Sequence, residues 1–329
     1  MTLPSKIQQL RSLAAQSQEQ AAYAVTLLHM RYGAETVLAA LQTLTKIEFD
    51  AARPALLTLF ADYTAQGERR DPAAFFRAAI LRALRPGVQP ADVGLLTQAT
   101  ATYVFPPPAF KEEGAPLRSA ALLALAEVDE TLARYHAVRL LANEHTDPMS
   151  GEPALTAARL LAAQEEWLPL YFYAMQDGAR VVPEVVADCL RQLTLLPAAL
   201  LPGIIERFAA GTASMALVGL FDLLLNHRTG PHGLDFLRSF LRTTTEIDFY
   251  RYLVTTMVAS GQERLLAELL DAARFEQKRE KIAILSEALA LLPPNPAIGE
   301  AIEQLRKRLG QSQSRSRVSS ADESHESSQ

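Results

Sequence analysis

Histidines are the residues of this sequence best suited to metal or acid–base chemistry, but their spacing is poor for either. His227 and His232 flank a short turn, where two imidazoles could share a metal ion. No carboxylate or thiol lies close by in the sequence to complete that site, so we interpret both as solvent-exposed turn residues. His136, His145 and Asp147 form a second group and lack further ligands in the same way. The sequence therefore predicts no metal site.

Cys189 is the only cysteine, so an internal disulfide is impossible. Apolar residues at helical spacing surround it, namely Val185, Val186, Leu190 and Leu193. This pattern predicts a small buried side chain on a helix rather than a reactive thiol.

Motifs for nucleotide binding or hydrolysis are missing from the sequence. There is no GxGxxG, GxxxxGK[ST] or GxSxG pattern. The adjacent carboxylates Glu112-Glu113, Asp129-Glu130 and Glu165-Glu166 fall in expected loops or helix starts, where acids are solvated or complement the helix dipole. We therefore predict a protein that is not an enzyme and that needs no cofactor.

Two clusters of aromatic residues are the more informative feature. Successive helical residues turn by about 100°, so three adjacent aromatic side chains cannot all point to one buried stripe. Any that reach solvent would be natural anchors for a protein partner, because Tyr and Trp bury a large area at little entropic cost. The candidate partner-binding residues are Trp167, Tyr171, Phe172, Tyr173, Phe249, Tyr250 and Tyr252.

Composition limits the class of partner. The chain has 329 residues, of which 49% are hydrophobic and 21% charged, with a formal net charge of −5. A strongly basic field is absent, so binding to nucleic acid through phosphate neutralisation is not expected. The first residues contain no basic segment followed by an apolar one, and long uncharged runs are short or broken by proline. We predict a cytoplasmic chain with no membrane insertion, whose partner is another protein.

Apolar residues recur at helical spacing along almost the whole chain, and strict alternation is nearly absent. Proline and glycine divide the chain into segments of roughly 10 to 16 residues, the usual length of a helix in a globular protein. Start signals support this division, such as Asp71-Pro72, Pro90 to Asp92, Ser150 to Pro153 and Pro183-Glu184. About eighteen helices fit.

Four of these segments resemble one another. They begin at Leu117, Leu155, Val185 and Met215, at intervals of about 30 to 37 residues, and each has small residues at its centre and leucines on either side. Small central residues allow a neighbouring helix to approach closely. A recurring unit of this length predicts helix pairs that stack in chain order.

The segment 117–126 carries the apolar-Arg-x-Ala-Ala run of a HEAT-repeat second helix, and the chain resembles the HEAT-repeat family over residues 115–230. This resemblance implies an all-α superhelix of stacked antiparallel helix pairs, a HEAT-like solenoid. Asp147 lies in a suitable turn, but Pro153 replaces the basic region that would complete the ladder between HEAT repeats. Armadillo-like and irregular helix-pair arrangements therefore stay open.

Composition also suggests four parts. Residues 1–104 form an N-terminal helical block, and 105–116 form a proline-rich connecting loop. Residues 117–309 carry the HEAT-like repeats. The serine-rich residues 310–329 cannot bury a core and are predicted to be a disordered tail.

These observations favour a non-catalytic scaffold or adaptor that binds another protein along the concave surface of the solenoid. The step from fold to function is an analogy. Two alternatives stay open. One is a HEAT-like enzyme that resembles DNA base-excision glycosylases or bilin lyases. The net charge of −5 argues against the glycosylase, which would have to bind DNA. The other is a structural subunit of a larger complex.

Overall fold

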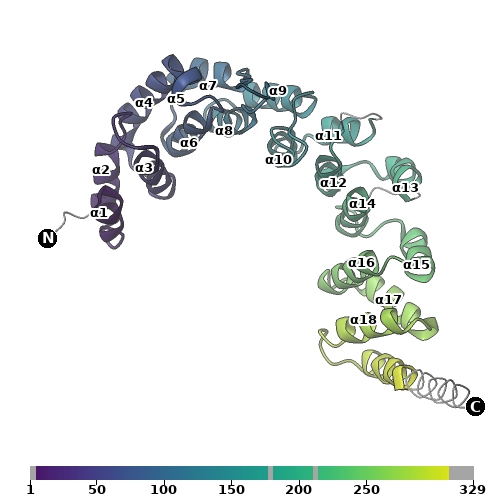
Figure 1. Cartoon of the computed structure of the whole chain (residues 1–329). Helices are drawn as coiled ribbons and strands as arrows, with labels where there is room; N and C mark the ends of the chain where they lie inside the picture. The colour runs from purple at the N-terminus through teal and green to yellow at the C-terminus, as the bar shows by residue number, and fades with distance from the viewer. Residues whose placement is uncertain (1–4, 177–180, 210–213, 311–329) are drawn as a thin grey trace, which may run out of the picture. The chain divides into compact units, whose positions relative to one another are not determined.

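The computed structural model describes residues 5–176, 181–209 and 214–310. Within these residues the fold is all α-helical and contains no strand (Figure 1). The helical spacing of apolar residues and the estimate of about eighteen helices are confirmed. The predicted tail lies outside the described residues from 311 onward, and residue 310 still belongs to a last helical stretch over 296–310.

The α-helices follow one another with short connections. They are α1 (Lys6–Ser12), α2 (Ser17–Thr26), α3 (Ala34–Lys46), α4 (Arg53–Ala65), α5 (Gly67–Arg70), α6 (Phe75–Leu84), α7 (Val93–Thr100), α8 (Ala115–Ala126), α9 (Glu130–Leu141), α10 (Ala154–Ala163), α11 (Trp167–Ala174), α12 (Pro183–Gln192), α13 (Leu201–Ala209), α14 (Ser214–Asn226), α15 (Leu234–Thr243), α16 (Ile247–Ala259), α17 (Glu263–Phe275) and α18 (Arg279–Leu289).

Local sequence explains several helix starts. Helix α12 begins at Pro183, as its start signal predicts, and α10 begins directly after Pro153. The Asp71-Pro72 signal was placed too early, since α6 begins only at Phe75. The Asp71 carboxylate still serves that helix, because it accepts hydrogen bonds from the backbone N–H of Phe76 (2.9 Å) and Arg77 (3.0 Å). An acid in the preceding loop therefore caps two backbone N–H groups in the first turn of α6.

The chain divides into two compact units, residues 1–188 and 189–329. In the first unit α8 is central, since it packs on α6, α7, α9 and α10 (Figure 1). Its middle residues Ala120, Ala121 and Ala124 are buried, and their small side chains let the neighbouring helices approach closely. Helix α10 in turn packs against both α9 and α11.

In the second unit α16 is central and packs on α14, α17 and α18, while α15 packs on α17. Polar pairs join helices about two positions apart in the order. Arg191 Nε lies 2.7 Å from Asp222 Oδ2, 31 residues away, and Tyr252 donates to Asp222 Oδ1 at 2.6 Å across 30 residues. Arg238 and Glu268 are also 30 residues apart and form a two-contact ion pair at 2.8 and 2.5 Å.

The predicted connecting loop 105–116 lies inside the first unit. The segment between α7 and α8 is non-helical over 101–114, as its prolines indicate, and α8 begins at Ala115. Its carboxylate Glu112 is tied to the buried Arg118 of α8 by two contacts of 2.7 Å. The loop is thus anchored to the core, and the further division of the chain into a helical block and repeats stays a prediction.

Candidate functional site

One side of α9 exposes a stripe of uncharged residues to solvent. The stripe consists of Thr131, Tyr135, Val138 and Ala142, at steps of four, three and four residues. Tyr135 is 62% exposed and Val138 is 42% exposed, values that are high for large apolar side chains on a helix. A surface helix normally places charged or polar residues on this side.

Leu168 and Phe172 of helix α11, with Gln176 just beyond its end, form a second exposed and uncharged stripe at steps of four residues. Leu168 is 48% exposed and Phe172 is 60% exposed. Isolated apolar residues on a surface need no explanation, but a contiguous set indicates an interaction surface.

Val138 and Ala142 of the first stripe and all three residues of the second line a common groove of about 270 Å³, whereas Thr131 and Tyr135 do not line it. Its walls are almost entirely apolar, which suits an apolar ligand surface better than a polar substrate. Tyr173 forms part of the floor and is buried, and its hydroxyl accepts a hydrogen bond from the backbone N–H of Val182 at 3.3 Å. The groove is lined by Val138, Leu141, Ala142, Leu168, Pro169, Phe172, Tyr173 and Gln176.

Helix α10 holds the two sides of this groove in place. Its buried residues Ala157, Ala158 and Leu161 let it pack closely on its neighbours. Arg134 of α9 crosses to the turn before α11, where its Nε lies 3.2 Å from Glu166 Oε1 and 3.4 Å from Gln164 Oε1. The groove is therefore a built feature of three helices.

A buried histidine supports α9 from beneath. Arg139 donates to His136 Nδ1 at 3.3 Å and to the Thr100 carbonyl oxygen at 2.7 Å. Because arginine only donates, Nδ1 is the acceptor and the proton of a neutral ring sits on Nε2. Burial, and then the charge of Arg139, lower the pKa of His136. This histidine is thus a neutral structural group, with no reacting partner in view.

The first predicted aromatic cluster belongs to this site only in part. Phe172 is exposed and lines the groove, and Tyr173 lines it from a buried position. Trp167 and Tyr171 are half-buried and do not line it. The expectation that three neighbouring aromatic residues cannot share one buried stripe agrees with this fan of exposures.

The second predicted cluster lies in the other compact unit and does not join the groove. Tyr250 is fully buried, with the ammonium of Lys281 lying 4.7 Å from its ring centre. Tyr252 and Phe249 are half-buried, and the Tyr252 hydroxyl donates a hydrogen bond to Asp222. In this cluster Tyr250 packs in the core, and Tyr252 is hydrogen-bonded within the unit.

The sequence analysis missed Tyr135, Val138 and Leu168. Their signal was present, because 131, 135, 138 and 142 form a helical stripe without a charge. An apolar stripe at helical spacing ordinarily marks the core, however, so the pattern alone could not separate a buried face from an exposed one.

The histidine turn near α14 is fully hydrogen-bonded. His227 is buried rather than solvent-exposed, so that prediction was wrong, and His232 is half-buried. His227 Nε2 lies 2.6 Å from the Leu196 carbonyl oxygen, and Thr229 Oγ1 lies within 3.0 Å of both rings. These hydrogen bonds fix the positions of both imidazoles, and the spacing of the two histidines in the sequence does not predict them.

Other chemistry finds little support in the described residues. Among them no three His, Cys, Asp or Glu side chains gather as a metal site. Cys189 is buried, as predicted. None of the helices in the described part of the chain is long and apolar enough to cross a bilayer.

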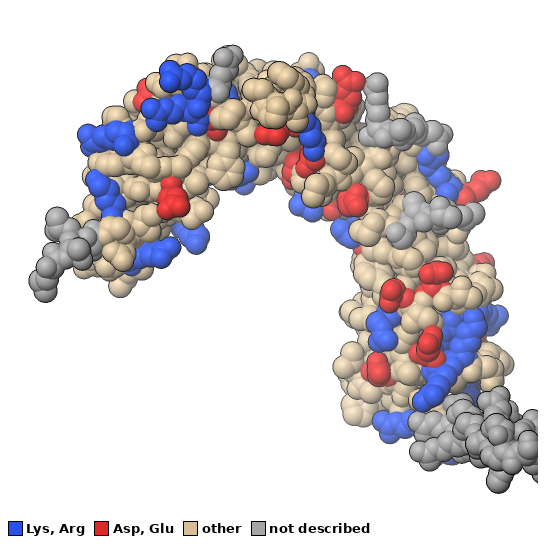
Figure 2. Space-filling view, in the orientation of Figure 1, with Lys and Arg blue, Asp and Glu red and all other residues tan. Residues whose placement is uncertain are grey.

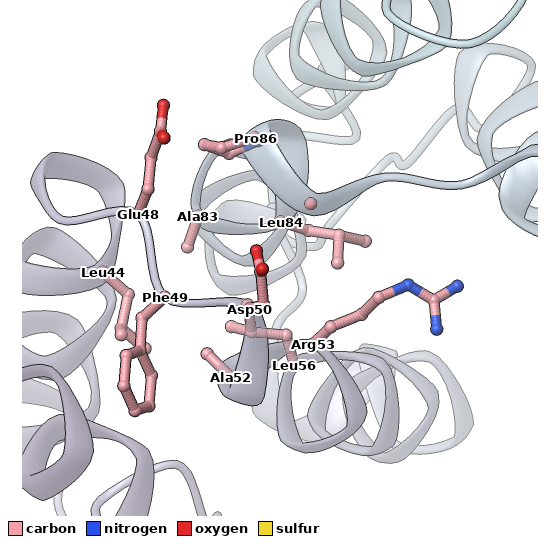
Figure 3. Close-up of a pocket in the computed structure, with 11 residues that line it drawn as sticks. Leu44, Glu48, Phe49, Asp50, Ala52, Arg53, Leu56, Ala83, Leu84 and Pro86 are labelled. Atoms are coloured by element: carbon pink, nitrogen blue, oxygen red, sulfur yellow. The ribbon is translucent and has the colours of Figure 1, made fainter.

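A second cleft, beside Phe49, encloses only about 20 Å³, room for about one water molecule. Figure 3 shows that the charged end of Arg53 points away from the carboxylates of Glu48 and Asp50 there. Arg53 is instead paired with Asp92 at 2.6 Å. The cleft has neither the space nor the converging groups of an active site.

Comparisons with protein-family models, with curated proteins and with solved structures gave no match.

Proposed function

We propose that this protein is a non-catalytic scaffold that binds a helix of a partner protein in the groove between α9 and α11. The observation that carries the proposal is the pair of exposed, uncharged stripes on either side of one apolar groove. Three exposed large apolar side chains line it, namely Val138, Leu168 and Phe172. Covering them would remove a substantial apolar area from water.

A helix is the occupant that this groove fits best. The two stripes repeat at steps of three and four residues, as the ridges of a helix do. A third helix could lay its own apolar ridge between them, anchored by side chains spaced three or four residues apart. Phe172, which lines the groove, would supply an aromatic anchor of the kind that often dominates such interfaces.

A solenoid of HEAT-like helix pairs is the arrangement we propose around this groove. Polar pairs such as Arg191 with Asp222 and Arg238 with Glu268 join residues 31 and 30 positions apart, which supports a two-helix unit of that length. The sequence analysis assigned binding to a concave surface. The exposed side chains of α9 and α11 support this groove as the binding surface instead.

The test introduces charge into the groove. Leu168→Asp/Phe172→Asp should fold normally, because both side chains are exposed, and should weaken partner binding at least about a hundredfold. Ser239→Asp/Thr255→Asp adds the same charge at exposed positions of α15 and α16 and serves as the control. Each variant would be used for affinity purification from cells that naturally produce the chain.

A stoichiometric partner retained by the wild type and the control but lost by the groove variant would support the proposal. Equal recovery with all three proteins would exclude the groove, and no stoichiometric partner at all would exclude the scaffold function. Light scattering after size exclusion separates two other outcomes. A groove-dependent dimer would identify a second copy as the occupant, whereas a large assembly insensitive to the groove would favour a structural subunit.

A further inference from the structure

The turn between α2 and α3 presents one tyrosine, Tyr32, beside two cations. Arg31 Nη2 donates to the Tyr32 hydroxyl at 2.9 Å, and the Arg31 guanidinium carbon lies 4.8 Å from the centre of the ring. The ammonium of Lys6, the first residue of α1, lies 4.0 Å from the same ring centre. Two positive groups from separate segments of the chain therefore converge on one phenol ring.

The backbone on both sides of this cluster is held in place. Within the turn, His29 Nδ1 accepts the backbone N–H of Arg31 at 3.0 Å, and the His29 carbonyl oxygen accepts that of Tyr32 at 3.0 Å. A capping box fixes the start of α1, where Lys6 lies, and α1 packs on both α2 and α3. The fold therefore brings the two segments together.

No acid neutralises either cation. Within residues 5–176, 181–209 and 214–310, no ion pair joins Lys6 or Arg31 to a carboxylate. Hydrogen bonding by Arg31, and then by Lys6, lowers the pKa of Tyr32, because both cations stabilise the phenolate. A tyrosine becomes a better nucleophile when its deprotonated form is favoured in this way.

The other tyrosines offer a comparison. Burial raises the pKa of Tyr63, Tyr250 and Tyr252. Tyr135 of α9 is 62% exposed, and no cation of the described part of the chain lies over its ring. Tyr32 is only half-buried, so exposure alone would make Tyr135 the more reactive of the two, whereas the neighbouring cations favour Tyr32.

We propose that Tyr32 is a modification site whose hydroxyl oxygen accepts a phosphoryl group, which Lys6 and Arg31 then hold. The oxygen would attack the terminal phosphorus of a nucleoside triphosphate bound to a separate kinase. The bond from Tyr32 Oη to phosphorus forms as the bond from phosphorus to the bridging oxygen breaks. The nucleoside diphosphate leaves with that electron pair, and the phenol proton passes to a base of the kinase.

A phosphoryl group suits this pair of cations well. It carries a charge of about −1.5 to −2 at neutral pH and offers three acceptor oxygens. Arg31 can give these oxygens two parallel contacts, and Lys6 adds a point charge. None of these residues lines the groove between α9 and α11, so this site is separate from the one proposed for a partner helix.

The first test measures the nucleophilicity of Tyr32 in the full chain. An aryl sulfonyl fluoride, whose sulfur is tetrahedral and oxygen-rich like the phosphorus of a phosphoryl group, forms an oxygen–sulfur bond with a phenolate and releases fluoride. Peptide mass spectrometry would follow the modification of each tyrosine at about pH 7.5. We expect Tyr32 to react at least about fivefold faster than Tyr135, and its rate to reach half of its plateau at a lower pH.

Variants show whether the cations cause this reactivity. Lys6→Met/Arg31→Met removes both charges and should slow the reaction of Tyr32 at least about fivefold. Arg11→Met removes an exposed cation from another position of α1 and should leave the rate unchanged. Thermal midpoints within about 2 °C of wild type would show that each variant folds. Tyr32 reacting no faster than Tyr135, or as fast in the double variant as in wild type, would overturn the proposal.

The second test asks whether the cations hold the phosphoryl group. Phosphotyrosine would be incorporated during translation in place of Tyr32 or, in the control, of Tyr135, and its second ionisation followed by ³¹P NMR. At position 32 this ionisation should occur at a pH lower by at least about 0.5 than at position 135, and Lys6→Met/Arg31→Met should abolish the difference. Equal ionisation at both positions would overturn the proposal, whatever the outcome of partner capture by the groove.

Discussion

Helices α9 and α11 in the first unit and α15 and α17 in the second show how differently two helix pairs of this fold can meet solvent. The exposed sides of α9 and α11 carry Tyr135, Val138, Leu168 and Phe172. The corresponding stretch of α15 and α17 carries ion pairs, and Figure 2 shows acidic and basic side chains intermingled over these helices.

The ion pairs of the second unit join the two helices directly. Arg238 pairs with Glu268 at 2.5 Å, and Arg242 pairs with Asp271 at 2.8 Å. Such pairs keep a surface soluble and contribute little to stability. The comparison teaches that a shared helical architecture does not determine what a helix pair exposes, since large apolar residues reach solvent on α9 and α11 where α15 and α17 carry ion pairs.

The largest expected effect concerns a buried ion pair of the first unit. In the first unit Arg118 and Glu112 pair in the interior, with side chains 0% and 6% exposed. Burial by itself would raise the pKa of Glu112, but the hydrogen bond and charge of Arg118 hold that pKa below its usual value. Arg118→Met should cost about 3–5 kcal/mol of unfolding free energy, because Glu112 would remain buried without its partner.

Urea denaturation followed by circular dichroism measures this loss. Arg82→Met is the matched control, since Arg82 is exposed on α6 of the same unit, and it should change stability by no more than about 0.5 kcal/mol. A similar small change for Arg118→Met would show that residues 101–114 are not held by this pair.

The next effect concerns pH and helix α9. The pKa of His136 is lower in the folded chain than the ordinary histidine value of about 6.5. As the pH falls below about 6.5, His136 is therefore protonated in the unfolded chain before it is protonated in the folded chain. The contribution of neutral His136 to folding stability is present above about pH 6.5 and is lost as the pH falls through the pKa of His136 in the folded chain. Wild type should therefore lose more stability between about pH 7.5 and 5.5 than His136→Gln does.

Thermal melts at several pH values test the sign. His232→Gln provides the comparison in the second unit, where burial and then the charge of His227 also lower the pKa of His232. An identical pH slope for wild type and His136→Gln would contradict the buried, neutral role of His136.

The smallest effect is expected from the surface pairs of the second unit. A double-mutant cycle of Arg242→Ala and Asp271→Ala should give a coupling energy of no more than about 1 kcal/mol, since the side chains are 52% and 33% exposed. The coupling should fall further in high salt. A coupling energy between Arg242 and Asp271 as large as the stability loss from Arg118→Met would contradict the expected difference between a buried and an exposed ion pair.

Much of the fold was predictable because helix formation is local. Apolar spacing gave the all-α class, and proline and acid signals gave the starts of α10 and α12. The sequence predicted the start of α6 too early. Asp71 caps this helix from a loop four residues before its first residue, Phe75, and a cap signal in the sequence does not give the length of such a loop. The partner of Arg118 was also missed, since the path of a proline-rich loop is not encoded by periodicity.

The site was predictable only in outline. Aromatic crowding on α11 showed that one buried stripe could not easily hide all of its aromatic side chains, but not that Phe172 would be exposed and Tyr173 buried. That outcome depends on which side α10 occupies, which is a tertiary fact. Tyr250 and Lys281 show the same limit, because a fully buried lysine is placed by its bond to the Leu241 carbonyl oxygen at 2.7 Å, 40 residues away in the sequence.

Asp222 has a practical consequence for shortening the chain. This one carboxylate joins Arg191 of α12 and Tyr252 of α16 to its own helix, α14. Removal of α12 or α16 alone would therefore leave the buried Asp222 carboxylate without one of its two hydrogen-bond donors. Deletions that stop between α14 and α16 should therefore yield less soluble protein than deletions that keep residues 189–310 together.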